Sequence, residues 1–299
     1  MTNKYQFAAT ILLLTNIFSC GMKRNKKVKP DHTDAAALLA CKHGQRENLE
    51  HFIEKERQLI HKKFAFDKTL MHIAAENIHP HIIKMLCERG ANINAKNDIR
   101  QTPLMVACKI GDSKTVKTLC EKGANVNDRA NWKRTPFMFA CESGDLKTVK
   151  TLCENKADIH AEDDFEITPL IFTAKSGHIN IVKFLCKKKV NVNTQDSKGN
   201  TALIFAAKNG HANVVKHLCK NDADVNIGNL WGTTPFMIAC EKGHLEIVKI
   251  LCAHNATIKY DLLKTKKEIT DYIKKIEEQR KKETTKSIKS LFRGKKEKN

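Results

Sequence analysis

The chain has 299 residues, with 53 Lys or Arg against 33 Asp or Glu, so its formal net charge is +20. Hydrophobic residues make up 41% of the chain, which is enough for a folded core and excludes a wholly disordered protein. Apolar runs stay shorter than the ~20 residues of a membrane-spanning helix, which excludes a polytopic membrane protein. Much of the positive charge lies near the two ends, which favours contact of the ends with anionic surfaces.

The first residues have the order of an export signal. An apolar stretch centred on Ile11–Leu14 follows one basic residue and precedes Ile17-Phe18-Ser19-Cys20. That tetrapeptide resembles a bacterial lipobox, whose Cys becomes the lipidated first residue, although Phe18 stands where a small residue is commoner. We therefore predict a signal peptide over residues 1–19, lipidation of Cys20 and a basic tether over residues 20–33. The alternatives are an ordinary cleaved signal and an incidental apolar terminus.

A period of 33 residues organises the chain after this segment. It is carried by one Thr and one Cys that each recur six times. The positions are Thr69, Thr102, Thr135, Thr168, Thr201 and Thr234, and Cys87, Cys120, Cys153, Cys186, Cys219 and Cys252.

Shorter motifs recur between these positions: Thr-Pro-Leu/Phe, Ala-Cys or Ala-Ala, Gly-His or Gly-Asp, and Gly-Ala-Asn-Val-Asn. In one copy, Thr102 is placed to cap a helix, Pro103 to begin it and Gly111 to end it. The pattern resembles the ankyrin repeat over about residues 34–258. The resemblance implies an all-α solenoid of about seven helix-turn-helix repeats with short hairpin turns, in which stacked repeats form the core.

The repeats are expected near residues 35–68, 69–101, 102–134, 135–167, 168–200, 201–233 and 234–258. The first is atypical and the last loses its hairpin, as end caps should. Beyond them, Leu262, Ile269 and Ile273 share one helical face, which predicts a C-terminal capping helix over residues 259–283. A partner helix or coiled coil is the alternative for this segment. Residues 284–299 are expected to form a basic flexible tail.

The repeat register accounts for ten of the eleven cysteines, and Cys20 belongs to the signal. Six occupy one second-helix position, and the other four occupy one first-helix position: Cys41, Cys108, Cys141 and Cys240. We expect reduced, buried thiols, with pairs such as Cys108–Cys120 as the alternative in an oxidising compartment. Cys-x-x-Cys spacing and the common catalytic motifs are missing, so we expect no catalytic residue, no metal site and no cofactor.

The resemblance implies that a partner binds the hairpin tips and the face formed by the first helices. The residue three places before each repeat Thr is predicted to lie at a tip, and both Trp of the chain occur there. These residues are Ile99, Trp132, Phe165, Lys198 and Trp231. Aromatic residues on a turn are typical interface anchors, with packing on the neighbouring hairpin as the alternative.

Four basic residues complete the predicted partner-binding set: Lys109, Lys175 and Lys208 on first helices, and Arg134 beside a turn. Because acidic residues occur among them, this groove suits a protein better than nucleic acid. We predict a monomeric, noncatalytic protein–protein interaction scaffold with an unidentified protein partner. Lipidated Cys20 would hold it on a membrane of the bacterial cell envelope, and a secreted or cytoplasmic location is the alternative. The alternative function is binding of anionic lipid headgroups or nucleic acid through the basic ends.

Overall fold

A computed structural model of the chain describes residues 32–258 and 266–296, with side chains described from residue 33 to residue 285. The predicted signal peptide, Cys20 and nearly all of the basic tether lie outside the described residues. The described residues are helical, apart from turns and one isolated bridge between Gln195 and Thr201.

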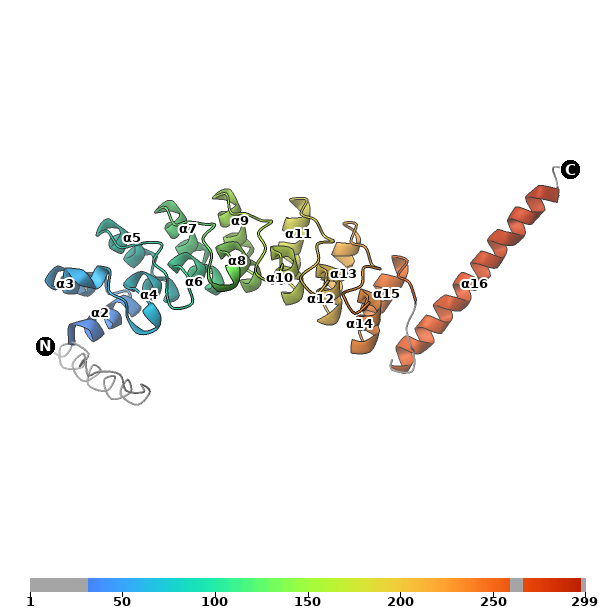
Figure 1. The fold of residues 1–299 in the computed structure, drawn as a ribbon, viewed down its shortest axis with the longest axis horizontal. Coiled ribbons are helices and arrows are strands. Elements are labelled where there is room, and N and C mark those ends of the chain that lie inside the picture. Colours follow the sequence, from blue (N-terminus) through green and yellow to red (C-terminus); the bar gives the residue numbers. More distant parts are fainter. Residues whose placement is uncertain (1–31, 259–265, 297–299) are drawn as a thin grey trace. The chain divides into compact units, whose positions relative to one another are not determined.

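The chain divides into two compact units, residues 1–158 and residues 159–299. Each is built from successive helix pairs (Figure 1). The first unit contains α2 (His32–Lys42), α3 (Arg46–Lys55), α4 (Leu70–Glu76), α5 (Pro80–Glu88), α6 (Pro103–Ile110), α7 (Ser113–Glu121), α8 (Pro136–Ser143) and α9 (Leu146–Glu154), with short 3-10 turns at Arg57–Ile60, Ala65–Asp67 and Asn131–Lys133. The second contains α10 (Pro169–Ser176), α11 (Ile179–Lys187), α12 (Ala202–Lys208), α13 (Ala212–Cys219), α14 (Pro235–Lys242), α15 (Leu245–Ala253) and α16 (Lys267–Lys296).

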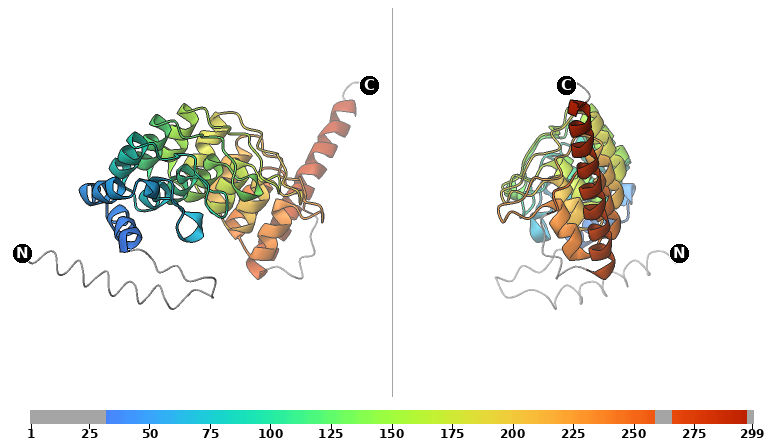
Figure 2. Two further views of the ribbon diagram at one scale, coloured as in Figure 1. Left: turned by 60° about the vertical axis from the view of Figure 1, so that its left-hand side comes forward. Right: turned by 90° about the vertical axis from the view of Figure 1, so that its right-hand side faces the viewer.

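Within each unit, helices of the same kind pack against each other. First helices contact first helices, as in α4–α6–α8 and α10–α12–α14, and second helices contact second helices, as in α5–α7–α9 and α11–α13–α15. The turns that lead into the first helices lie together on one side of the helix pairs in either unit (Figure 2). The fold is therefore an all-α helical repeat, as predicted.

The helix ends follow from the residues predicted to form them. The Thr102 side chain accepts a hydrogen bond from the amide of Met105. Pro103 fills the first position of α6, where the backbone N–H that proline lacks would have no acceptor within the helix. Gly111 ends α6 in the left-handed region at φ 82°, which glycine adopts without strain. Asp112 then caps α7 by accepting from the Thr115 amide at 2.9 Å.

The core of each repeat centres on the residue two places after the repeat Thr. Every residue at this position is at most 3% exposed: Met71, Leu104, Phe137, Leu170, Leu203 and Phe236. The second helices add a Val or Ile and a Leu, such as Val116 and Leu119, which are fully buried. Burial of such side chains supplies about 1.5–3 kcal/mol each, which makes the stacked pairs, rather than a single pair, the stable unit.

The ten cysteines between Cys41 and Cys252 are all free thiols in the structure. The four on first helices are buried, as are three on second helices, whereas Cys87, Cys120 and Cys153 are partly exposed. The prediction of ten buried thiols is therefore wrong for these three. All six second-helix Cys follow a fully buried Leu and so lie at the edge of the buried face, where even the buried Cys186 and Cys219 keep 9% and 8% of their surface exposed.

Burial raises the pKa of eight of these thiols, which keeps them protonated at neutral pH. It raises the pKa of Cys41 to about 12 and that of Cys120 to about 11. A thiol acts as a nucleophile or metal ligand only as the thiolate, so these side chains serve as small apolar groups.

Helix α16 packs on the last repeat through its first turns. Ile269 and Ile273 are at most 1% exposed, and Arg280 Nη2 donates to the carbonyl of Cys252 at 3.0 Å. The helix continues to Lys296, so residues 284–296 are helical where we expected a flexible tail. Residues 284–293 contain neither Gly nor Pro, and so nothing in them interrupts the helix.

His72 in α4 joins the start of its repeat to the turn that leads into the next one. Its Nδ1 accepts from the amide of Thr69 at 3.2 Å, and its Nε2–H donates to the carbonyl of Gln101 at 2.9 Å. The neutral ring satisfies both bonds, and burial lowers the pKa of His72 below its usual 6.5.

We expect His72 to make the protein sensitive to mild acid. Above pH 6.5 the ring is neutral in both the folded and the unfolded chain, so its contribution to stability is complete. As the pH falls below 6.5, the unfolded chain gains a proton that the folded ring resists, and stability is lost. Urea unfolding should show a larger loss of stability on acidification for the parent than for His72→Gln. Equal losses would contradict this role.

Candidate protein-binding surface

Six turns of similar construction precede the six repeat threonines. In each, the amide five places before the Thr donates to the carbonyl one place before it, as from Asn97 to Gln101 at 3.0 Å. In four turns that first residue is Asn or Asp, whose side-chain oxygen also accepts from the last amide of the turn: Asn97, Asp163, Asp196 and Asn229.

Phe64 and Ala130 hold this position in the other two turns and have no side-chain acceptor. In these turns two successive residues adopt the left-handed region, and Trp132 and Lys133 do so at φ 56° and 55°. In the four Asn or Asp turns only the second of these residues does: Arg100, Glu166, Gly199 or Gly232. The first residue of the turn therefore decides the conformation of the tip.

Successive turns are joined by main-chain hydrogen bonds at the tip. In the first unit the carbonyl of Phe66 accepts from the amide of Asp98, and that of Ile99 accepts from Asn131, both at 3.2 Å. In the second unit Phe165 and Lys198 accept in the same way from Ser197 and Leu230, at 3.0 and 3.1 Å. The tip side chains take no part in these bonds.

The predicted tip side chains are all exposed to solvent. Trp132 is 62% exposed and Trp231 69%, while Ile99 and Phe165 are near one half, and Lys198 is exposed too. Rings packed on the neighbouring hairpin would be much less accessible. The tips therefore present apolar surface in each unit.

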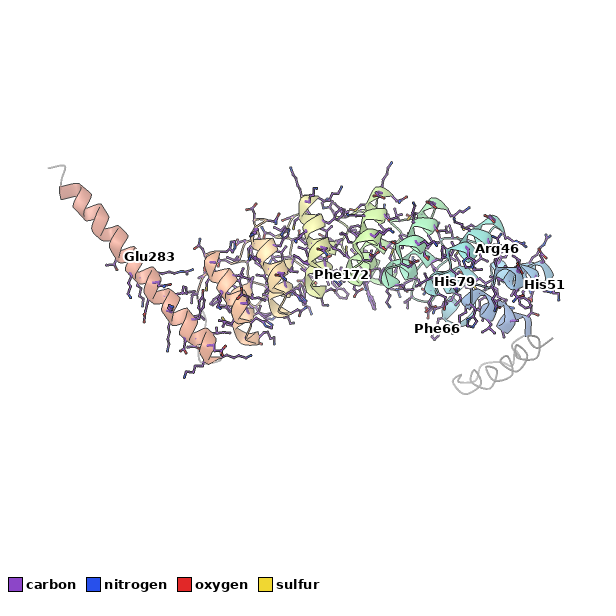
Figure 3. The ribbon with its side chains drawn as sticks, turned by 180° about the vertical axis from the view of Figure 1, so that it is seen from behind. Arg46, His51, Phe66, His79, Phe172 and Glu283 are labelled. Atoms are coloured by element: carbon purple, nitrogen blue, oxygen red, sulfur yellow. The ribbon has the colours of Figure 1, made fainter. Side chains whose placement is uncertain are left out.

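Two exposed residues of this surface were missed in the sequence. Phe66, 71% exposed, lies in the loop before α4 at the tip position that precedes Thr69 (Figure 3), so the 33-residue register was sufficient to find it. Leu230, 74% exposed, precedes Trp231 at a place where the other repeats carry Ala or polar residues, so the register gave no indication of it.

The charged residues on the first helices fall into two groups. In the first group an acid near the end of a first helix pairs with the basic residue just before the repeat Thr: Lys68 with Glu76 at 2.8 Å, and Arg134 with Glu142 at 2.6 Å. The Arg134 guanidinium also lies 4.2 Å from the centre of the Phe139 ring, and its side chain is only 17% exposed. Arg134, predicted as a partner-binding residue, is therefore held by the first helix that follows it, α8.

The three predicted lysines stand at the helix position that Glu76 and Glu142 hold in other repeats. The residue just before the repeat Thr, which is basic where Glu76 or Glu142 follows, is neutral before each of these lysines. Lys109, Lys175 and Lys208 are exposed, and among the described residues none has a carboxylate within 4.0 Å. They add positive charge to the first-helix face of the units that contain them.

Other kinds of site find little support in the described residues. They contain no group of three or more His, Cys, Asp or Glu placed to hold a metal ion. No described helix is long and apolar enough to cross a membrane. A hollow beside Ile60 and Lys96 has a volume of about 260 Å³, smaller than most ligand pockets.

Stacked helix pairs with projecting turns define a class of repeat proteins that act as protein-interaction scaffolds. A family model described as ankyrin repeats in three copies matches residues 5–97, 95–163 and 137–229, and a model of ankyrin repeats in many copies matches residues 219–260. The chain belongs to the ankyrin repeat family, which is typically noncatalytic.

A curated relative is alpha-latrocrustotoxin-Lt1a of Latrodectus tredecimguttatus, 28% identical over 97 residues. The match takes in 32% of this chain and 7% of the toxin. This chain thus spans a small part of the relative's length, and the similarity is confined to a short segment.

Proposed function

We propose that the hairpin tips and the first-helix face bind one protein partner. The observation that carries the proposal is the set of large apolar side chains at the tips of the turns, where the bonds to neighbouring turns use main-chain atoms. In the first unit these are Phe66, Ile99 and Trp132, and in the second Phe165, Leu230 and Trp231. Folding leaves these side chains in water, and covering them would remove that apolar surface from solvent.

Their chemistry suits a protein partner. Interface cores are enriched in aromatic residues, which anchor the partner from well-packed pockets, and charged residues lie around them. Lys109 in the first unit and Lys175 and Lys208 in the second would supply such a charged rim. An acidic and apolar partner surface would match both features.

The tips are tested by the double variant Trp132→Ala/Phe165→Ala. Truncation of one anchor aromatic costs at least about 2 kcal/mol of binding, or roughly thirtyfold, so the pair should abolish partner recovery. Crosslinked co-purification from native membranes measures recovery, and circular dichroism measures helical content. Lys198→Ala, at the same register but without an apolar side chain, is the matched control.

The result separates two roles of the rings. Loss of the partner with unchanged melting temperature supports the proposal. An unfolded double variant would show that the rings stabilise the fold, and a folded variant that keeps its partner would place the binding surface elsewhere.

The second part of the proposal is a lipid tether at Cys20 that holds the scaffold on a bacterial envelope membrane. It is supported by the sequence Ile17-Phe18-Ser19-Cys20 after an apolar stretch. Two or more acyl chains would give stable attachment, because each buried CH₂ contributes about 0.8 kcal/mol.

Metabolic labelling with a fatty acid tests the tether. The parent protein should be labelled and sediment with membranes, and Cys20→Ala should lose the label and become soluble. Cys41→Ala, a change at a cysteine of the repeat domain, should keep both properties. An unlabelled parent protein would exclude the tether and leave a secreted or cytoplasmic scaffold.

A further inference from the structure

A lysine recurs on the second helix of each of the six repeats that begin with Thr, fifteen residues after that Thr. All six are exposed: Lys84, Lys117 and Lys150 in the first unit, and Lys183, Lys216 and Lys249 in the second. This position lies outside the hairpin tips and the first-helix face, and the protein-binding surface makes no use of it.

The residue four places later differs between the two units. In the first unit it is Glu in every repeat, and Lys117 Nζ lies 3.8 Å from Glu121. In the second unit it is Lys187 after Lys183, Lys220 after Lys216 and the neutral Ala253 after Lys249. Opposite charges at this helical spacing attract and like charges repel, so the second unit carries unfavourable pairs where the first carries favourable ones.

These residues form a concentrated basic surface, here called the α11–α13 lysine patch. Its members are Lys183, Lys187, Lys188, Lys189, Lys216 and Lys220, all exposed. Helices α11 and α13 pack side by side and contain neither Asp nor Glu. Among the described residues, no carboxylate lies within 4.0 Å of any of the six ammonium groups.

His217, on α13, lies close enough to the patch for the lysine charges to affect its pKa. Burial lowers the pKa of His217, and the charges of Lys183 and Lys220 lower it further. The nearest acids in sequence, Asp222 and Asp224, follow α13 in the next loop. Attraction to the helix C-terminus accounts for a lysine such as Lys187 in the last turn, but not for three in succession or for the mid-helix lysines.

The composition of the patch distinguishes between anionic partners. Residues 159–258 contain no Arg, the residue that grips phosphates and bases with a planar fork. Phe184 on α11 is half-buried, with Lys188 Nζ 5.7 Å from its ring centre, so the described residues of α11 and α13 offer no exposed aromatic ring to stack on a base. The described residues of α11 and α13 also lack an exposed large apolar side chain to anchor a protein.

Binding to a bilayer surface with anionic headgroups requires neither Arg nor an exposed aromatic ring or large apolar side chain. Lysines attract it as point charges, and the attraction grows with the number of lysines near the surface. We propose that the α11–α13 lysine patch binds the surface of an anionic phospholipid bilayer. This contact is independent of the lipid tether at Cys20 and of the partner at the hairpin tips.

The test uses the full chain with Cys20→Ala, so that no acyl group contributes. Sedimentation with vesicles of phosphatidylglycerol and phosphatidylcholine in equal parts is compared for two variants. Lys187→Glu/Lys220→Glu restores the Lys–Glu pattern of the first unit, where the fold already accepts Glu88, Glu121 and Glu154 at this position. Lys114→Glu/Lys147→Glu makes the same charge change at exposed positions of α7 and α9.

A lysine at an anionic surface contributes roughly fivefold to binding, so the patch variant should lose at least about tenfold in vesicle partitioning. Its melting temperature should match that of the parent, and added salt should weaken the parent more than the variant. The α7/α9 variant should keep most of its binding.

Three results would overturn the proposal. Equal losses in the two variants would mean that net charge alone drives binding, and no loss in either would exclude the patch. Tighter binding to polyuridylate than to vesicles, lost in the same variant, would assign the patch to nucleic acid instead.

Discussion

Phe137→Ala should lower the free energy of unfolding by about 3–5 kcal/mol, because the ring is fully buried in α8 and its removal leaves a cavity among packed helices. The neighbouring repeats cannot collapse onto the cavity without breaking their own helix contacts. Urea unfolding followed by circular dichroism measures the change.

Trp132→Ala, five residues earlier in the same repeat, is the control. Its side chain is 62% exposed, so stability should change by less than about 0.5 kcal/mol. If both variants were equally destabilised, the assignment of Phe137 to the core and of Trp132 to the surface would be wrong.

Ile273→Asp should release α16 from the last repeat. Ile273 is fully buried, and an unpaired carboxylate at this site should cost more than about 3 kcal/mol. The bond from Arg280 to the carbonyl of Cys252 would then be lost with the helix. Limited proteolysis should cut the variant between α15 and α16 much faster than the parent.

Lys274→Asp places the same residue at the adjacent, exposed position and controls for helix propensity. It should leave the cleavage rate close to that of the parent. Rapid cleavage of both variants would indicate that helix stability, rather than packing of Ile273, holds α16 in place.

Much of the fold was predictable because the residues that begin and end each helix can be recognised within the repeat itself. Thr102, Pro103 and Gly111 act through bonds to residues within a few places, so local chemistry is sufficient to position them. The extent of α16 was not predictable in the same way. The charged residues after Glu283 are compatible with a solvated tail and with a helix, and no Gly or Pro marks an end before residue 294.

The candidate surface was predictable in register but not in detail. Counting back from each Thr finds every tip, Phe66 included, because the turns have equal length. The burial of the Arg134 side chain depends on its contacts with Glu142 and Phe139, which form only when α8 folds beside the turn. The contrast between lysine pairs on α11 and Lys–Glu pairs on α7 is visible in the sequence, but the grouping of the lysines on α11 and α13 follows from the packing of these helices.

At the tips, the bonds between successive turns join main-chain atoms on both sides, as between the Ile99 carbonyl and the Asn131 amide. A duplicated block of 33 residues would therefore bring its own donor and acceptor for this tip bond. The tip residue of the new copy could then change freely, because no bond depends on its side chain. A scaffold built in this way can acquire a new recognition element by duplication and a single later substitution.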